Sequence, residues 1–357
     1  MTTATTLDPQ KSEAFAGRLL GYINGAGLAM MISIGHRTGL FDALADGQSR
    51  TSDELATTAG LDERYVREWL GAMTTGALVD HDAETKRFRL PAEHAAWLTR
   101  EASPQNMAVT AQFVSVLGGV EDDIVTCFRE GGGVPYDAFP RFHEVMAEES
   151  AQTVLAPLED AILPLVPGLI ERLESGIDVL DIGCGRGRAM IQLAARFPKS
   201  TFTGYDISEE AITDGRREAQ AKGLDNVRLE VQDVANLPGT TFDLVTAFDA
   251  IHDQAAPATV LSEIASSLRP GGVFLMQDIH ASSHVEKNLE HPLAPFLYTI
   301  SAMHCMTVSL AADGDGLGTC WGEEKAVSML KDAGFGSVDV SRLEHDIQNN
   351  YYVAQLA

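Results

Sequence analysis

The spacing of apolar residues changes in character at about residue 175. Before that point, apolar residues recur every three or four positions, which is typical of amphipathic helices. After it, short apolar segments alternate with amphipathic helices, and this order predicts a parallel sheet with helices on both faces. The strands are predicted at residues 177–182, 202–207, 227–231, 242–248 and 273–276, separated by helices at 188–197, 208–222 and 257–268.

The first hundred residues are predicted to form a helical domain that ends in a hairpin. Residues 12–44 predict amphipathic helices that are broken by three glycines, Gly25, Gly27 and Gly39. Two more helices are predicted, one beginning at residues 51–56 and one at 61–70. Short strands at 78–80 and 87–90 then flank a polar turn. Helices followed by such a hairpin are typical of a winged helix, so residues 1–100 are predicted to be a winged-helix-like domain.

A winged helix that reads DNA inserts a short, basic helix into the major groove. The candidate here is the helix at residues 61–70, whose Tyr65, Trp69 and Leu70 are predicted to face inward. That helix carries three acidic residues and two arginines, and residues 41–100 hold 11 Asp or Glu against 7 Lys or Arg. We therefore expect this domain to serve dimerisation or support of the fold. A regulator that binds DNA is kept as the alternative function.

Composition narrows the class of partner and the compartment. The 51 acidic and 26 basic residues give a formal charge of −25, so neither nucleic acid nor an anionic membrane is expected to bind. The first ten residues lack the pattern of a signal peptide, and we expect no apolar stretch of about 18 residues. Four well-separated cysteines, Cys127, Cys184, Cys305 and Cys320, fit a reducing cytoplasm.

A glycine-rich turn follows the first predicted strand of the sheet. After Asp181, the glycines Gly183, Gly185 and Gly187 let backbone amides approach a ligand where any side chain would collide. The next helix begins at about residue 188, and its free amides suit an anionic group placed over the turn. Asp206 ends the second strand, where its two oxygens can accept hydrogen bonds from both hydroxyls of a ribose.

The spacing of these glycines argues against a dinucleotide. A dinucleotide turn has glycine at its first, third and sixth positions, and the third of these glycines packs helix against strand beside the pyrophosphate. Counting from Gly183, the sixth position is Arg188. The pattern therefore favours a nucleoside ligand that lacks a pyrophosphate.

With these features, residues 177–357 resemble a class I S-adenosyl-L-methionine-dependent methyltransferase. The segment at 179–187 matches the first motif of that family, and the segment at 268–272 matches the turn before its fifth strand. A helix at 323–333 and strands at 338–340 and 351–354 match its ending. The resemblance implies an α/β, Rossmann-like sheet of seven strands with a reversed last strand. The whole chain is similar to plant-type small-molecule O-methyltransferases and to mycobacterial methyltransferases of the same layout.

This resemblance implies S-adenosyl-L-methionine as the cofactor and assigns its contacts. The backbone from Gly183 to Gly187 would hold the methionine end, Asp206 the ribose, and Asp233 the adenine amino group. Asp181 is expected either to cap the turn or to face the ligand. Asp233 could alternatively be only a turn residue at the end of its strand. Cys184 is expected to be a small residue that fills space. The other residues expected at the cofactor are Ile207, Gln232, Val234, Phe248 and Asp249.

The candidate for the chemistry is His252. Methyl transfer to a hydroxyl requires alignment and removal of a proton, for which an imidazole is suited. Plant-type O-methyltransferases carry His-Asp at the position of His252 and Asp253, and there the histidine is the base. The residues after it depart from that pattern, so a role in lining the pocket stays open. Asp278 is the expected partner that orients His252, although Gln277 lies nearer the family's acidic helper.

The remaining expectations concern metals and domain limits. Four histidines, His280, His284, His291 and His304, have spacings that match no standard ligand set, so no metal is expected. Residues 101–175 are predicted to be a helical linker and active-site roof, and 176–357 the cofactor domain. Within it, residues 281–321 are predicted to form a substrate-pocket insertion, with Phe296, Tyr298, Met303 and Met306 lining an apolar pocket or a plain core. The acceptor is expected to be a small apolar or aromatic molecule, and the protein a homodimer through its N-terminal domain.

Overall fold

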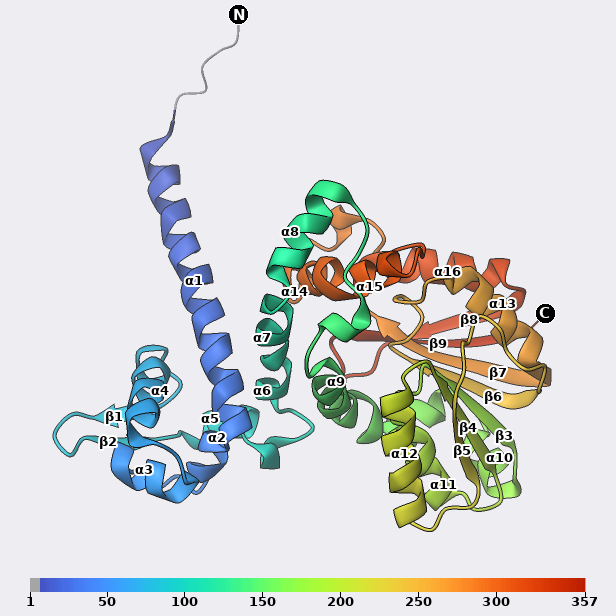
Figure 1. The fold of residues 1–357 in the computed structure, drawn as a ribbon, viewed down its shortest axis with the longest axis horizontal. Coiled ribbons are helices and arrows are strands. Elements are labelled where there is room, and N and C mark those ends of the chain that lie inside the picture. The colour runs from blue at the N-terminus through green and yellow to red at the C-terminus, as the bar shows by residue number, and fades with distance from the viewer. Residues whose placement is uncertain (1–6, 357) are drawn as a thin grey trace, which may run out of the picture. The chain divides into compact units, whose positions relative to one another are not determined.

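The computed structural model describes residues 7–356, and the chain divides into two compact units after Gly118 (Figure 1). The predicted helical linker at residues 101–175 is therefore shared between the two units. Seven helices and one hairpin are described in the first unit. They are α1 (Pro9–Thr38), α2 (Leu40–Ala43), α3 (Ser52–Ala59), α4 (Glu63–Thr75), β1 (Asp80–Asp82), β2 (Arg87–Arg89), α5 (Ala92–Leu98), α6 (Met107–Thr110) and α7 (Gln112–Gly118).

The predicted helices and hairpin of the winged helix are present. Helix α3 begins with a capping box between Thr51 and Glu54, and β1 pairs with β2 in an antiparallel register. Trp69 of α4 is 1% exposed, and its indole nitrogen donates to the Met31 carbonyl oxygen at 2.9 Å. The prediction that Tyr65 also faces inward is wrong, because its side chain is 80% exposed. Helix α4 buries one narrow face, and Tyr65 lies outside it.

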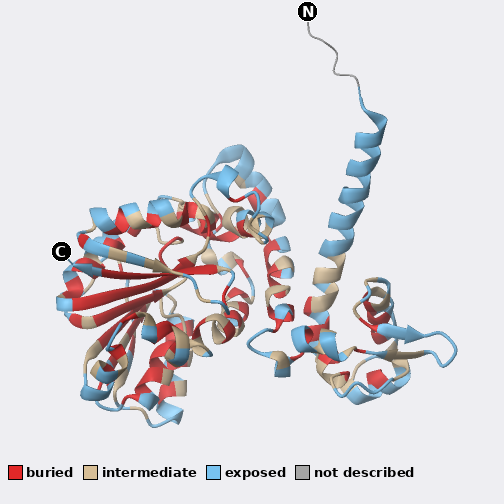
Figure 2. Cartoon of the chain, turned by 180° about the vertical axis from the view of Figure 1, so that it is seen from behind, coloured by how far each residue is buried: buried red, intermediate tan, exposed pale blue. Residues whose placement is uncertain are grey.

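Helix α1 is one unbroken helix of 30 residues, which corrects the prediction of breaks at Gly25 and Gly27. A glycine inside a helix costs only about 1 kcal/mol relative to alanine, which weakens a long helix without ending it. The helix ends at Gly39, whose φ of +73° forms a left-handed cap. Most of α1 is exposed, as the pale blue helix in Figure 2 shows.

Among the described residues, two helices are long and apolar enough to cross a membrane, judged by length and composition alone. One is α1, and the other is the continuous helical stretch Ala294–Ala311 in the second unit. This corrects the expectation that no apolar stretch of about 18 residues exists. The second stretch packs inside its unit, where His304, Cys305 and Val308 are buried, so it is a core element there. Helix α1 is the exposed one.

The second unit contains the predicted seven-stranded sheet in the order β5-β4-β3-β6-β7-β9-β8. Strands β3 to β7 are parallel, and β9 runs antiparallel to both β7 and β8. The reversed last strand is therefore confirmed. The strands are β3 (Asp178–Ile182), β4 (Thr201–Asp206), β5 (Val227–Val231), β6 (Phe242–Phe248), β7 (Leu268–Ile279), β8 (Phe335–Ser341) and β9 (Asn349–Leu356).

Helices cover both faces of this sheet, which explains why its central strands are mostly buried (Figure 2). One face packs on α10 (Leu169–Ser175), α11 (Arg188–Arg196) and α12 (Glu209–Ala221), and the other on α13 (Pro257–Ser267) and α16 (Gly322–Asp332). The remaining helices are α8 (Glu121–Glu130), α9 (Phe142–Ser150), α14 (Ala294–Ile300) and α15 (Met306–Ala311). Single turns of π-helix occur at Ala151–Leu155, Leu158–Ile162 and Ser301–Cys305.

Candidate active site

The glycine turn after β3 leaves an open space at one position only. Gly183, Gly185 and Gly187 have φ values of +64°, +54° and +65°, which disfavour any other residue. A Cβ at Gly183 would lie 2.5 Å from the Ala250 Cβ, and one at Gly187 would lie 2.4 Å from a methyl carbon of Leu229. A Cβ at Gly185 would meet nothing within 4 Å. The outer glycines therefore pack against protein, while the middle one borders open space.

Asp206 is anchored over this turn by main-chain amides. One carboxylate oxygen accepts from the Gly185 amide at 2.7 Å, and the other accepts from the Ser208 amide at 2.8 Å. Each carboxylate oxygen has a second lone pair, so both can accept one more hydrogen bond. Ile207 follows with its side chain 71% exposed. The end of β4 thus presents a fixed carboxylate beside an exposed apolar side chain.

The start of α11 is the second polar feature of the turn. Its N-cap is Gly187, which has no side chain to bond the first amides of the helix. These amides and the positive end of the helix dipole suit an anionic group. Cys184 is half-buried, and burial raises the pKa of its thiol well above the usual value, so it stays neutral.

Asp181 faces the interior of the sheet. Its carboxylate accepts from the Thr246 hydroxyl at 2.6 Å, and the side chain is buried. Burial raises the pKa of Asp181 to about 7, although the Thr246 hydroxyl opposes this shift. The Asp181 carboxylate is thus held by the neighbouring strand β6, and its role as a cap of the turn or at the ligand stays a prediction.

The residues predicted at the adenine edge take different orientations. Gln232 donates to the carbonyl oxygens of Asp233 and Asn236, at 3.0 and 2.8 Å, and so closes the loop after β5. One carboxylate oxygen of Asp233 accepts from the Ala235 amide at 2.9 Å, and its residue is exposed. Val234 is buried in the core of the sheet. The Asp233 carboxylate is therefore accessible here, and the Val234 side chain is not.

The structure brings His252 and Asp278 together in the interior. The His252 Nδ1 lies 2.9 Å from a carboxylate oxygen of Asp278, and both side chains are buried. The same oxygen accepts from the Trp321 indole nitrogen at 2.9 Å and from the Ile279 amide at 2.8 Å. Gln277 bonds Asp346 instead, because adjacent residues of β7 point to opposite faces of the sheet. Asp278 is thus fixed by two donors besides the imidazole.

The surroundings of His252 favour its charged form. Burial by itself would lower the pKa of His252, but the Asp278 carboxylate and the Cys305 thiol outweigh burial and raise it well above 6.5. The pKa values of nearby carboxyl groups are raised as well, which favours their neutral forms. Burial raises the pKa of Asp253 to about 6 and that of Asp249 well above its usual value. Asp249 has a φ of +53°, and one of its buried carboxylate oxygens has no hydrogen-bond partner among the described residues. Phe248, the residue before it, packs against the hydrophobic core.

Several further residues lie around this pair; the sequence pointed to His304 only as a candidate metal ligand and to Trp321 not at all. Trp321 belongs to the helical turn before α16, and Cys305 to the π-helical turn before α15. His304, which is 1% exposed, stacks on Phe142 with ring centres 3.6 Å apart and lies edge-on to Tyr136 and Phe139. The spacing of three aromatic residues at 136, 139 and 142 was the available signal. Their convergence on His304 depends on tertiary structure.

The histidines considered as metal ligands do not converge. The rings of His280 and His291 are 4.9 Å apart, His284 is exposed, and His304 lies in the aromatic cluster. Within residues 7–356, no group of three or more His, Cys, Asp or Glu side chains is arranged to hold a metal ion. His280 and His291 both have lowered pKa values, first because of burial and then because of the nearby Arg342.

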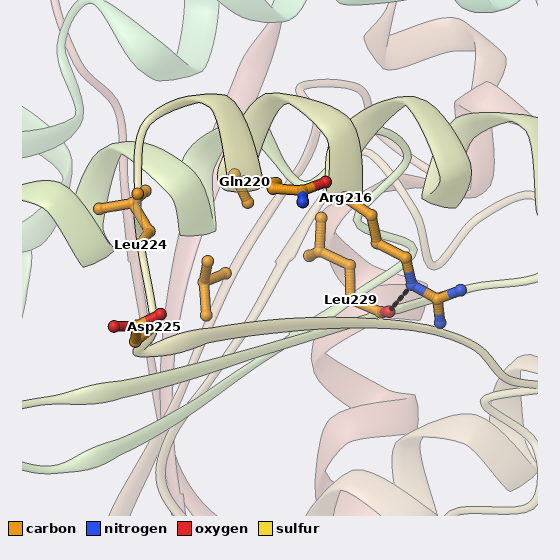
Figure 3. Close-up of a pocket in the computed structure, with 8 residues that line it drawn as sticks. Arg216, Gln220, Leu224, Asp225 and Leu229 are labelled. Carbon is orange, nitrogen blue, oxygen red and sulfur yellow. Dashed lines mark hydrogen bonds between the residues drawn. The ribbon is translucent and has the colours of Figure 1, made fainter.

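A separate hollow of about 240 Å³ lies between the end of α12 and the beginning of β5 (Figure 3). Figure 3 shows Arg216 and Gln220 of α12 above Asp225 and Leu229, with the Arg216 side chain donating to the Leu229 carbonyl oxygen. Ligands of parallel sheets bind beyond the carboxyl ends of the strands. The hollow opens near the amino end of β5, so it is distinct from the site described above.

Comparisons with known proteins agree with this geometry. Residues 26–100 match the family described as "Rv2258c-like winged HTH domain", and residues 173–334 match "Methyltransferase domain". The fatty-acid O-methyltransferase of Mycolicibacterium smegmatis is 37% identical over 103 residues. That match covers 29% of this chain and only 37% of the relative.

Solved structures match over nearly the whole chain. An O-methyltransferase from Nostoc punctiforme has a TM-score of 0.71 at 18% identity and covers 98% of this chain and 100% of its own. Human N-acetylserotonin methyltransferase, solved in complex with S-adenosylmethionine, has a TM-score of 0.67 at 17% identity, with coverage of 99% and 100%. At these identities the likeness establishes the fold.

Proposed function

Because this chain carries a methyltransferase domain behind a winged-helix domain, we propose that it is an S-adenosyl-L-methionine-dependent methyltransferase that O-methylates a small-molecule acceptor. The observation that carries this proposal is the buried His252–Asp278 pair, which lies beyond the carboxyl end of β6. Methyl transfer to a hydroxyl requires that its proton be removed, and the pair provides a group for this task in the interior.

The residues of the glycine turn fit S-adenosyl-L-methionine. Gly185 borders open space, and the uncapped start of α11 offers amides for the methionine carboxylate. Asp206 would accept hydrogen bonds from the ribose hydroxyls, and Ile207 would contact the adenine ring. The exposed carboxylate of Asp233 would accept from the adenine amino group. When bound, the cofactor supplies an activated methyl group.

His252 would act as the base for the acceptor hydroxyl. Its Nδ1 is held by Asp278, so Nε2 is the nitrogen that would take the proton. Asp278 fixes the orientation of the ring and stabilises the imidazolium that forms, and Trp321 and the Ile279 amide fix Asp278. Burial excludes water from the pair. The residues of the chain thus align the acceptor and hold its proton at a defined atom.

The acceptor is proposed to be a small apolar or aromatic molecule. Tyr136, Phe139 and Phe142 form a ring cluster with His304, and His304 is near enough to His252 that the charge of His252 helps to lower its pKa. Aromatic side chains favour flat or apolar ligands. The fatty-acid specificity in the name of the mycobacterial relative is consistent with an apolar acceptor. The pocket-lining role of Phe296, Tyr298, Met303 and Met306 stays a prediction.

The alternative function, a regulator that binds DNA, is not favoured. The two arginines of α4 are held by glutamates four residues away on the same helix, in the ion pairs Arg64–Glu68 and Arg67–Glu63. A helix that reads DNA needs free basic side chains for phosphates and bases. The matches of the chain are to methyltransferases.

Calorimetry with S-adenosylhomocysteine tests the cofactor site directly. We expect the wild-type chain to bind it, and Asp206→Asn to lose affinity roughly 10- to 100-fold, as the loss of hydrogen bonds to a charged group costs about 1.5–3 kcal/mol. Absence of binding by the wild type would contradict the proposed function. The acceptor is then sought in fractionated cell extracts supplied with the cofactor, by mass gains of one methyl group.

We further propose that the chain forms a homodimer in the cytoplasm, with α1 of each copy packing against its partner. Phe15, Leu19, Leu20, Tyr22 and Ile23 are exposed on α1. Gly17 and Gly21 have nothing within 4 Å of an added Cβ, so a second helix could approach closely. A membrane is the less favoured occupant, because the charge-free stretch of α1, residues 19–35, ends in residues that are buried against the protein, among them Ser33, Gly35 and the following His36.

Sedimentation of the full chain tests this interface. Leu20→Glu is expected to shift the chain from dimer to monomer, because it places a charge in the centre of the apolar face. Phe128→Glu is the matched control. Phe128 is also a large apolar residue exposed at the surface, but it lies on α8 and not on α1. A wild-type chain that sediments as a monomer would contradict the proposal. So would a wild-type chain that sediments with phosphatidylcholine vesicles and does not form a dimer.

A further inference from the structure

His304 is a buried polar side chain that the rest of the fold leaves without a hydrogen bond. The residue is 1% exposed, and neither ring nitrogen has a hydrogen-bond partner among the described residues. Burying a donor or acceptor in this way costs stability, so an orphaned nitrogen in a native fold points to a water, an ion or a functional role. Thr319 repeats the pattern, because it is 1% exposed and its hydroxyl is also unpartnered within residues 7–356.

Hydrogen bonds connect the turns that carry these two residues to the His252–Asp278 pair. His304 lies in the turn of π-helix at Ser301–Cys305, and such turns are frequent at functional sites. The Thr319 amide donates to the Ser301 hydroxyl oxygen at 3.1 Å. Trp321, two residues after Thr319, donates to Asp278 at 2.9 Å. The unpartnered groups therefore belong to segments that also fix the proposed base and its carboxylate.

The helix that follows His304 is also tied to the segment of His252. The Ser309 hydroxyl of α15 donates to the carbonyl oxygen of Gln254, two residues after His252, at 2.9 Å. Burial, then the charges of His252 and His143, lower the pKa of His304 to about 3, so its ring is neutral. A neutral imidazole has one donor and one acceptor nitrogen. The ring is therefore suited to bind an oxygen that accepts or donates a hydrogen bond.

The aromatic residues at 136, 139 and 142 surround His304 with apolar ring surface. Phe142 stacks on His304 with ring centres 3.6 Å apart, and the other two rings lie edge-on to it. The segment before them is packed tightly on α15. The Val134 amide donates to the Thr307 hydroxyl oxygen at 2.8 Å, and a Cβ at Gly133 would lie 2.0 Å from the Thr307 carbonyl oxygen. A polar ring among aromatic side chains is suited to a flat ligand that carries a polar group.

We propose that His304 determines acceptor specificity, and that its ring nitrogens bind a second oxygen of an aromatic acceptor, beside the hydroxyl that gains the methyl group. This inference rests on the proposed function for the transfer itself. A hydroxyl or carbonyl oxygen complements the neutral ring, and the Thr319 hydroxyl would add a further hydrogen bond. An acceptor with a single oxygen leaves the buried nitrogens unpaired, so it binds less tightly. The chain is therefore expected to prefer aromatic acceptors with two oxygens.

Histidine NMR of the full chain with S-adenosylhomocysteine added tests this contact directly. The probes are phenol, which has one oxygen, and catechol, resorcinol and hydroquinone, which place a second oxygen at each spacing on the ring. In a chain labelled with 15N-histidine, the His304 signals are those that are missing from His304→Met. At least one of the dihydroxybenzenes is expected to shift these signals and to bind about fivefold or more tightly than phenol. Unshifted His304 signals with all three would overturn the inference.

Calorimetry with the same probes compares variants of His304. His304→Met removes both ring nitrogens and still packs on aromatic rings, so the preference for the dihydroxybenzene over phenol is expected to disappear. His304→Gln keeps a donor and an acceptor and is expected to retain part of the preference. His291→Met is the matched control, because His291 also has a buried, unpartnered nitrogen in the described structure but lies beside His280. A preference that persists in His304→Met would overturn the inference.

Thermal unfolding separates ligand binding from a structural role of the ring. His304→Met is expected to have a Tm equal to or above that of the wild type, because it removes two unpaired polar atoms from the interior. His304→Gln is the second variant, in case methionine packs poorly. A Tm lowered by about 5 °C or more in both variants would show that the ring nitrogens stabilise the fold itself, and would overturn the inference.

These tests also distinguish this inference from the proposed function. If S-adenosylhomocysteine does not bind but a dihydroxybenzene shifts the His304 signals, the proposed function fails and the binding role of His304 is upheld. If the cofactor binds and methyl transfer occurs but the His304 signals do not move, the specificity role of His304 is wrong while the enzyme assignment survives.

Discussion

The two ends of the candidate active site are held by different kinds of interaction. At the cofactor end, the ligand-facing groups are backbone amides of the turn Gly183 to Gly187 and a carboxylate, Asp206, that is itself fixed by amides. At the acceptor end, the groups are side chains in the interior, and each is fixed by another side chain. In the proposed function, the first end would recognise its ligand by shape and hydrogen bonds, and the second would move a proton.

This difference has an electrostatic consequence. Asp206 keeps room for more hydrogen bonds, because each of its oxygens carries one amide contact. Burial raises the pKa values of Asp249 and Asp253, whereas the pKa of His252 is raised against the effect of burial by the Asp278 carboxylate. Perturbed groups cluster where proton transfer is needed. The comparison predicts that changes at one end alter binding and changes at the other alter rate.

The largest expected effect is on rate, from His252→Ala. Loss of a positioned base lowers kcat roughly 100- to 10,000-fold. The affinity for S-adenosylhomocysteine is expected to stay within about threefold of the wild type, because the cofactor end does not use this side chain. Single-turnover kinetics and calorimetry measure the two quantities. A comparable loss of cofactor affinity would break the division between the two ends.

The next effect is on affinity, from Gly185→Ala. The added methyl group would occupy the open space at a φ of +54°, so cofactor affinity is expected to fall about 10-fold or more. Gly271→Ala is the matched control, with a φ of +78° and open space in the turn within β7. Both variants are expected to lose about 1–2 kcal/mol of unfolding free energy. Equal cofactor affinity in the two variants would remove Gly185 from the site.

The third effect is a displacement of the pH profile, from Asp278→Asn. The Asp278 carboxylate raises the pKa of His252, so kcat/KM is expected to rise with pH through that raised pKa as the ring loses its proton. Without the carboxylate, burial lowers the pKa of His252, and the rise is expected to move at least one pH unit toward acid. Rates at high pH also fall, because the ring loses its orientation. A rise at the wild-type pH would show that Asp278 does not set this pKa.

The smallest effect is expected from Trp321→Phe. The change removes one of the donors to Asp278 and keeps most of the ring, so kcat is expected to fall about 2- to 10-fold, matching a hydrogen bond worth about 0.5–1.5 kcal/mol. Thermal unfolding serves as the control for packing. An unchanged kcat would leave the Ile279 amide as a sufficient anchor for the carboxylate.

Most of the sheet could be predicted from sequence because its signals are local. The predicted strands and helices from residue 177 on fall at the observed elements within a few residues, and the reversed strand β9 is where the closing pattern placed it. The exceptions have local reasons as well. Glycines at 25 and 27 did not end α1, because a single missing side chain weakens a long helix without breaking it.

The sequence by itself determined the fold and the place of the glycine turn and Asp206, because a strand, a glycine turn and the next strand end are continuous features with fixed spacing. The acceptor end depended on tertiary structure. Asp278 reaches His252, and Trp321 reaches Asp278, only after the sheet and the segments after β7 are in place. Side-chain pairs over such separations leave no periodic trace along the chain, because their geometry follows from packing.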